Sequence, residues 1–195
     1  MGMEKERRLT MEIRAADNSP PEEMIVEGYA VRFNERTMLY ELDGVQYFEV
    51  IERGALDTAD ISDVPMKYNH SDHVMIMART RSKTLTLTRD DQGLFIQARL
   101  ANTTAGRDLF ELVRRGDIDK MSFAFTVEED DYNRDTRTRS IKKIKKLWDV
   151  AAVDTPAYDT TSISARSFFE AEAEKERKAL ESAEWRRKLL LKTYL

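Results

Sequence analysis

Cysteine is absent from this chain of 195 residues, and histidine occurs only at His70 and His73. Without cysteine there is no disulfide, no thiolate nucleophile and no thiolate metal site, which fits a reducing compartment. The two histidines, with Asp72 between them, leave a metal site open as an alternative. A catalytic zinc needs three protein ligands, however, and the chain has only two imidazoles. We therefore expect neither a metal nor another cofactor.

Long apolar runs are also missing. No segment approaches the length of a membrane span, and the charged first eight residues lack the apolar core of a secretory signal. The sequence thus predicts a soluble protein made in a cytoplasm, with no membrane contact. A net charge of −4 argues against general affinity for nucleic acid. With 41% hydrophobic and 35% charged residues, the chain fits one domain with tails.

The first two-thirds of the chain has the pattern of short strands separated by turns. Candidate strands cover 24–33, 47–51, 64–69, 84–88 and 94–100. One helix interrupts them. Thr103 or Thr104 is its candidate N-cap, Leu109 and Val113 follow helical spacing, and Gly116 is its candidate stop.

Three residues on separate segments have the chemistry of acyl transfer without a metal. They are His70, Ser122 and Asp149. An imidazole can take the proton of a hydroxyl nucleophile, and a carboxylate can fix the imidazole tautomer and stabilise the imidazolium. Sequence order alone leaves open whether the three meet.

Strand alternation places Ser122 opposite Phe123 and Phe125, beside the small residue Ala124, where a substrate could approach. A polar residue on a solvated strand face explains a single serine equally well. Gly-x-Ser-x-Gly, the signature of a strained nucleophile turn, is absent.

Asp149 shares its alternation row with apolar residues from Leu147 to Val153, and a carboxylate in such a row needs a partner. An imidazole would serve, and so would a nearby lysine or water. Asp154 is a competitor by residue type, but alternation puts it on the other face, just before the Thr-Pro pair that ends the strand.

An ordered series of short motifs makes the chain resemble the prohead (procapsid maturation) proteases of HK97-like tailed bacteriophages. The motifs lie at 27–30, 48–56, 69–70, 78–79, 91–94, 114–116, 121–125 and 156–158, and the resemblance covers about residues 24 to 166.

The resemblance implies a serine endopeptidase that cleaves capsid scaffolding segments, and itself, inside an assembling prohead in the cytoplasm of a bacterial host. It implies an α+β fold similar to herpesvirus assemblin: a compact β-barrel of mostly antiparallel strands with surrounding helices. The family serine matches Ser122, the family histidine matches His70, and the acidic third member falls on Asp149. The major capsid protein or a scaffold segment would be the substrate, and self-association is expected.

Three residues differ from the family pattern: Asp149 stands where a glutamate is usual, and Ala78 and Ala124 stand where glycine is common. These differences support an alternative from another class, a catalytically silent scaffolding or interaction domain that retains the protease fold.

The expected organisation is an N-terminal extension over 1–23, a protease domain over 24–166 and a charged helical tail over 167–195. The tail has helix-forming composition, with Trp185 and the leucines at 189–191 available to meet a partner or another copy. Between the last two strands, an acidic run at 128–131 precedes a basic run at 134–146. We expect a solvated hairpin whose opposite charges attract, with a nucleic-acid or scaffold contact as the minor alternative.

Overall fold

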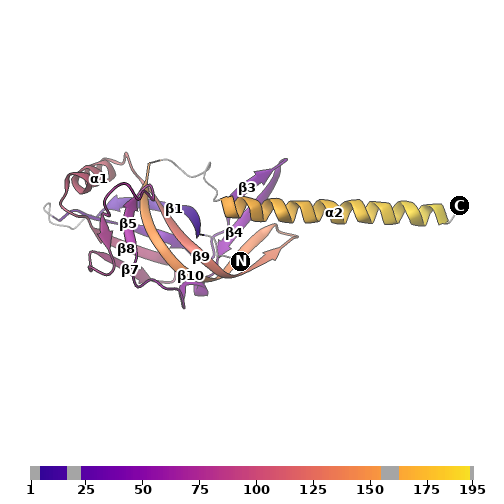
Figure 1. The fold of residues 1–195 in the computed structure, drawn as a ribbon, viewed down its shortest axis with the longest axis horizontal. Helices are drawn as coiled ribbons and strands as arrows, with labels where there is room; N and C mark the ends of the chain where they lie inside the picture. The colour runs from indigo at the N-terminus through magenta and orange to yellow at the C-terminus, as the bar shows by residue number, and fades with distance from the viewer. Residues whose placement is uncertain (1–4, 17–22, 155–162, 194–195) are drawn as a thin grey trace.

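The structure is a computed structural model that describes residues 5–16, 23–154 and 163–193. One twisted sheet of ten strands dominates it, with α1 near one end and α2 extending away from the other (Figure 1). The strands are β1 (Lys5–Ala15), β2 (Ile25–Arg32), β3 (Thr37–Leu42), β4 (Val45–Ile51), β5 (Pro65–Tyr68), β6 (Ala78–Arg79), β7 (Leu85–Arg89), β8 (Gly93–Arg99), β9 (Lys120–Asn133) and β10 (Thr138–Val153). The helices are a 3₁₀ turn, η1 (Arg53–Leu56), and the α-helices α1 (Thr104–Arg115) and α2 (Ile163–Thr193).

The strand order is β3-β4-β10-β9-β1-β2-β8-β7, and β5 pairs with both β10 and β6 off this path. Most pairs are antiparallel, while β10 runs parallel to β4 and β5. The α+β class is confirmed. Among the described residues the order has open ends at β3 and β7, so the sheet is not closed; the barrel and the likeness to assemblin stay predictions.

Residues 1–23, expected as an extension of the protease domain, include β1. This strand lies inside the sheet, between β9 and β2. The domain boundaries themselves remain a prediction, and the motif at 156–158 lies outside the described residues.

The ends of α1 follow the predicted signals. The Thr103 hydroxyl accepts a hydrogen bond from the Gly106 backbone N–H at 3.1 Å, and Gly116 ends the helix at a φ of 81°. A left-handed residue at this position is easiest for glycine, which has no Cβ. The buried side chains of Leu109 and Val113 belong to the main core.

The hydrophobic core lies against the face of β9 that carries Phe123 and Phe125, whose rings stack at 4.8 Å between centroids. The predicted hairpin is β7 and β8. Gly93 begins β8 and has to be glycine, because a Cβ there would lie 1.9 Å from the Val31 carbonyl oxygen. Because Phe123 and Phe125 belong to this core, the opposite face of β9, which carries Ser122, lies outside it.

Four charged side chains are buried on the core face as two glutamates and two arginines. We call Glu6, Arg8, Glu49 and Arg139 the inner charge cluster. Arg8 donates to the two Glu49 oxygens at 2.6 and 2.7 Å, and Arg139 donates to the two Glu6 oxygens at 3.0 and 3.1 Å. Such forked pairs satisfy both partners and offset the cost of burying charge.

The β9–β10 hairpin confirms the expected attraction between its acidic and basic runs. Lys143 forms an ion pair with Glu129, and Lys142 lies 3.5 Å from Asp131. Cross-strand pairs of opposite charge stabilise such a hairpin modestly.

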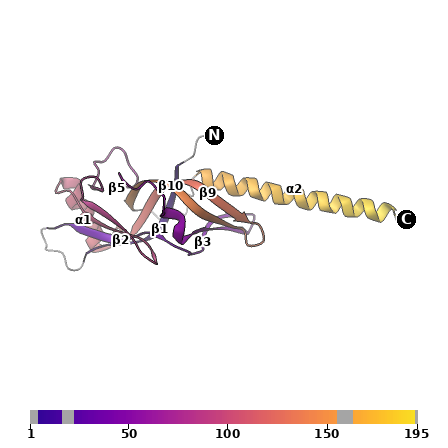
Figure 2. The same cartoon turned by 90° about the horizontal axis from the view of Figure 1, so that it is seen from below.

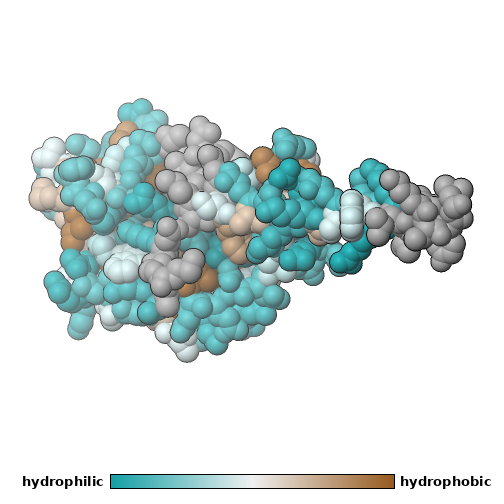
Figure 3. Space-filling view, turned by 45° about the vertical axis from the view of Figure 1, so that its right-hand side comes forward, coloured by the Kyte–Doolittle hydropathy of each residue, from teal (hydrophilic) through white to brown (hydrophobic). Residues whose placement is uncertain are grey.

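The α2 helix is anchored only near its start. Phe169 is fully buried and packs on Tyr40 and Tyr47 at ring distances of 6.5 and 5.4 Å. Figure 2 shows the rest of α2 as a straight rod directed away from the sheet, and Figure 3 shows it standing clear of a mainly hydrophilic surface. Trp185 is exposed, and the side chains at 189–191 lie outside the part that the structure describes. No helix in the described ranges has the length and apolar content needed to cross a bilayer.

Candidate active site

Ser122 lies on β9 with its side chain on the face opposite the core, as alternation predicts. Its cross-strand neighbour is Ala151 of β10, and the next pair on the same face, toward the hairpin tip, is Ala124 with Asp149. Ser122 is 3% exposed. Its neighbours Ala124 and Ala151 on this face are small and fully buried.

Asp149 reaches the same face as Ser122 through a β-bulge. Leu147 pairs with Phe125 and Asp149 pairs with Ala124, so Trp148 is the extra residue between them. The prediction that Leu147 and Asp149 share one face is therefore wrong: Leu147 is in the core and Asp149 faces Ser122's side. Bulges are known to redirect side chains in this way beside active sites.

His70 follows β5, which pairs in parallel with β10. In that register Tyr68 lies beside Ala152, so a straight strand would carry residue 70 to the level of Asp154. Instead Asn69 and His70 have φ values of 51° and 53°, and the chain turns. Left-handed conformations are costly for residues other than glycine, and their presence at a site indicates that the surroundings hold them there.

The turn brings the three predicted residues together. The Nε2 atom of His70 lies 2.6 Å from the Ser122 Oγ, and its Nδ1 atom forms a hydrogen bond with Asp149 Oδ1. All three are buried, and Asp149 is only 1% exposed. Asp154, the competitor, is not in this chain of contacts and accepts a hydrogen bond from the Tyr68 hydroxyl at 2.5 Å.

The carboxylate of Asp149 has a second partner that the sequence did not indicate. The Lys5 ammonium, at the start of β1, donates to Asp149 Oδ2 at 2.7 Å. Burial raises the pKa of Asp149, but the hydrogen bonds from His70 and Lys5 outweigh it and hold the pKa below its usual range. Asp149 is therefore ionised at neutral pH.

His73, the second member of the metal alternative, lies on the exposed loop that follows, where its backbone N–H donates to the Ser71 hydroxyl at 3.1 Å. Among the described residues no group of three or more His, Cys, Asp or Glu side chains is arranged to hold a metal ion.

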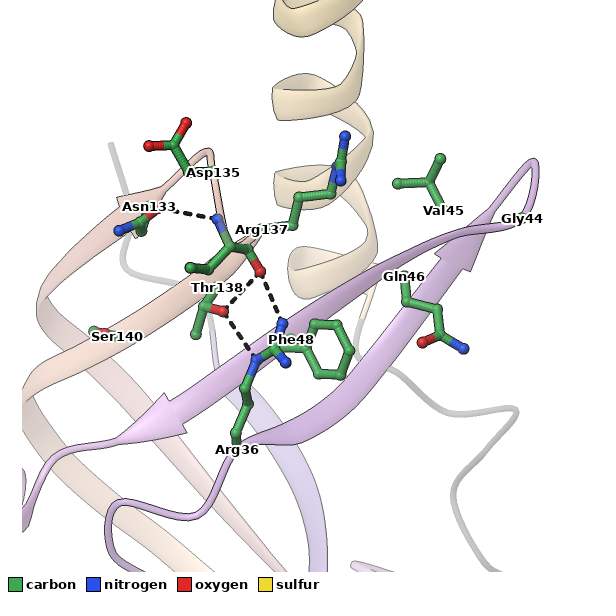
Figure 4. A pocket seen from close by; sticks show the side chains of 11 residues that line it. Arg36, Gly44, Val45, Gln46, Phe48, Asn133, Asp135, Arg137, Thr138 and Ser140 are labelled. Carbon is green, nitrogen blue, oxygen red and sulfur yellow. Dashed lines mark hydrogen bonds between the residues drawn. The ribbon is translucent and has the colours of Figure 1, made fainter.

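A cleft of about 730 Å³ lies away from these residues, between the β3–β4 and β9–β10 hairpins. Figure 4 shows Arg36 bonded to Thr138 and to the main chain there, with Arg137 pointing toward α2. Arg36 also stacks on Phe48 at 3.4 Å, so its guanidinium is already engaged. Neither histidine of the chain lines this cleft, and it is separate from the contacts of Ser122 with His70.

The arrangement is that of a serine hydrolase: a hydroxyl, an imidazole and a carboxylate in one line of hydrogen bonds. Residues 10–176 match the model of the caudovirus prohead serine protease family. The chain belongs to this family. Over 145 residues it is 29% identical to the prohead protease of Enterobacteria phage HK97, an alignment that covers 72% of this chain and 59% of that protein. The chain thus spans about three-fifths of the length of this curated relative. No solved structure matches the chain.

Proposed function

We propose that the chain is a serine endopeptidase of prohead maturation with Ser122 as nucleophile, His70 as general base and then general acid, and Asp149 as the residue that orients His70. The observation that carries the proposal is the hydrogen-bonded series from Ser122 through His70 to Asp149.

In the first half-reaction, Nε2 of His70 takes the Ser122 proton while Oγ attacks the peptide carbonyl carbon. The tetrahedral intermediate collapses, the C–N bond breaks, and His70 gives its proton to the leaving amine. Water then attacks the acyl-enzyme by the same steps and releases the acid. The ionised Asp149 keeps Nδ1 protonated, which leaves the Nε2 lone pair facing Ser122.

The substrate we propose is a capsid protein or scaffold segment, cut inside the prohead in the cytoplasm of a bacterial host, together with the protease itself. Family membership and the HK97 relative, whose name is prohead protease, support this assignment. The exposed part of α2, a charged helix outside the sheet, would be the segment that directs the protease into the shell.

The fold we propose is related to assemblin, with self-association as a means of control. The mainly antiparallel sheet and the position of α1 at its end support the first point. Leu180 and Trp185, both exposed on α2, support the second, because large apolar residues on a projecting helix are suited to a partner. Sedimentation and activity over one dilution series test it; a monomer with constant specific activity would contradict it.

The deciding experiment is labelling with a fluorophosphonate, which phosphonylates an activated serine hydroxyl with loss of fluoride. Wild-type protein should label and Ser122→Ala should not, with Ser71→Ala as the matched control because Ser71 is the serine beside His70. Mass spectrometry of the protein mixed with its capsid protein should then show new termini. A wild-type protein that neither labels nor cuts would instead be the catalytically silent domain.

A further inference from the structure

Asp149 uses its two carboxylate oxygens differently. Oδ1 faces Nδ1 of His70, and Oδ2 accepts from the Lys5 ammonium at 2.7 Å. A carboxylate with one free oxygen can rotate and lose its alignment with the imidazole. With one oxygen held by His70, in the turn after β5, and the other by Lys5 of β1, its plane is fixed.

Another cation lies near Oδ2 but is engaged elsewhere. Lys67 of β5 lies 4.0 Å from Asp149 Oδ2, beyond hydrogen-bond distance, and donates to Asp72 instead. Lys5 is therefore the cation that completes the coordination of this buried carboxylate.

The position of Lys5 is set by strand pairing rather than by a flexible tail. Lys5 pairs with Thr126 of β9, and the Thr126 hydroxyl accepts a hydrogen bond from the Trp148 indole N–H at 2.8 Å. The Lys5 ammonium lies 5.9 Å from the centre of the Trp148 ring. The bulge that places Asp149 on the same face as Ser122 thus also brings the Trp148 ring close to the Lys5 ammonium.

We propose that Lys5 is a positioning residue for the hydrolysis proposed above, on which this inference rests: its ammonium fixes Asp149 so that Oδ1 stays aligned with His70. Lys5 lies before residues 10–176, which match the family model, and its contact with Asp149 joins the first described residue of β1 to β10.

The contribution is orientation and ionisation of Asp149. The ammonium would also repel the imidazolium that forms during acylation, so it does not act by stabilising that cation directly. Replacing Lys5 should therefore slow the chemical step and leave reagent binding unchanged.

The test compares Lys5→Met, which keeps the aliphatic stem, with Lys5→Arg, which keeps a cationic donor. Lys146→Met is the matched control: Lys146 lies 4.8 Å from the centre of the Trp148 ring and forms an ion pair with Asp60, not Asp149. The measurement is the fluorophosphonate inactivation rate against reagent concentration. Lys5→Met should lower the maximal rate about 10- to 100-fold at unchanged half-saturation, because a charge-assisted hydrogen bond is lost.

Lys5→Arg should recover most of the rate, and Lys146→Met should stay within about 2-fold of wild type, as expected for an exposed pair. A wild-type rate in Lys5→Met would overturn the inference, and so would a rate as low in Lys146→Met as in Lys5→Met. Thermal unfolding of each variant separates a folding defect from a slow site; if Lys5→Met is unfolded, Lys5→Gln replaces it.

A second measurement does not depend on activity. In Ser122→Ala protein, the proton on Nδ1 of His70 can be followed by NMR in histidine-labelled samples, since His73 is the only other histidine. Adding Lys5→Met should shift this resonance, and Lys5→Arg should restore it. An unshifted resonance would overturn the Lys5 inference by itself. A wild-type protein that does not react with the fluorophosphonate would instead overturn the proposed protease function.

Discussion

Strand β1 makes charge contacts on both of its faces, fully buried on one and partly exposed at Lys5 on the other. On the outer face, Lys5 joins Asp149 and His70; on the inner face, Glu6 and Arg8 belong to the inner charge cluster. Both arrangements bury ionised groups and pair them closely. They differ in composition, because the outer contacts include an imidazole and a hydroxyl, groups that can pass a proton at neutral pH.

The inner charge cluster shows what buried charge does without such groups. Burial alone would raise the pKa of Glu6, but Arg8 and Arg139 lower it by more, so its pKa lies below the usual value. The glutamates in turn raise the pKa of both arginines. Glu6 and the two arginines are thus held in their charged forms. Buried, perturbed charges are therefore no evidence of catalysis by themselves; a proton acceptor in contact with a nucleophile is the distinguishing observation.

The largest expected effect breaks the outer contacts. Ser122→Ala and His70→Ala should each lower turnover by at least about 10⁴-fold, and the double variant should lose little more, because the residues act as a unit. Turnover of a capsid-derived peptide measures this, with thermal unfolding to show that the fold persists. Losses that multiply in the double variant would contradict the shared role.

Asp149→Asn should reduce turnover by about 10³- to 10⁴-fold and leave measurable activity. Asparagine keeps the shape but stabilises the wrong imidazole tautomer. Asp154→Asn is the matched control, since the Asp154 carboxylate accepts a hydrogen bond from the Tyr68 hydroxyl. Equal losses in both variants would remove Asp149 from its assigned role.

Breaking the inner charge cluster should affect stability and not chemistry. Arg8→Met leaves two buried glutamates short of a partner and should lower the free energy of unfolding by about 3 to 5 kcal/mol. Denaturant unfolding measures the loss, and activity per folded molecule should be unchanged. Arg7→Met, at the exposed neighbouring position, should change stability by less than about 0.5 kcal/mol. If Arg8→Met lowers the free energy of unfolding no more than Arg7→Met does, the inner charge cluster contributes little to stability.

Acid should reduce the stabilisation that the ionised Glu6 and Asp149 provide on the two faces of β1. The pKa values of Glu6 and Asp149 are lowered from 4.5 and 3.8, so the unfolded chain binds protons more tightly than the folded one. Their stabilisation is present above those values and is lost as the pH falls below about 4.5 and 3.8 toward the folded values. Denaturant midpoints from pH 7 to pH 3 should decline at the acid end, and less steeply in Glu6→Gln. Equal slopes would exclude Glu6 as a source of the decline.

The smallest effect is expected beyond the anchored part of α2. Ending the chain after Glu176 keeps Phe169 in place and should change the free energy of unfolding by less than about 0.5 kcal/mol. Ending it after Arg166 should leave a folded sheet that is measurably less stable, because the contacts of Phe169 with Tyr47 are lost. Identical stabilities of the two truncated chains would contradict the anchoring assigned to Phe169.

The sequence predicted the local elements well where pattern and end signals agreed. The strands that became β2, β4, β5, β7 and β8 have β-type runs between turns, and α1 has its cap and stop signals in view. The orientation of Ser122 followed from simple alternation along β9, because Phe123 and Phe125 mark the core face clearly.

Three features could not be predicted from the sequence pattern. In β1, Glu6 and Arg8 look like solvated charges, and only partners as distant as Glu49 and Arg139 make their burial possible. The bulge at Trp148 has no local signal either, and it reverses the alternation that placed Asp149 with Leu147. Lys5 was missed for the same reason: its partner lies 144 positions away.

That separation has a consequence in time. Lys5 and Asp149 lie 144 positions apart, and contacts of such high contact order form late because loop closure must come first. During synthesis, a partial chain that ends before β10 contains His70 and Ser122 but lacks Asp149. Under the proposed roles, such a chain should cleave peptides far more slowly than one that includes β10, so the order of translation would hold back activity until this strand has been made.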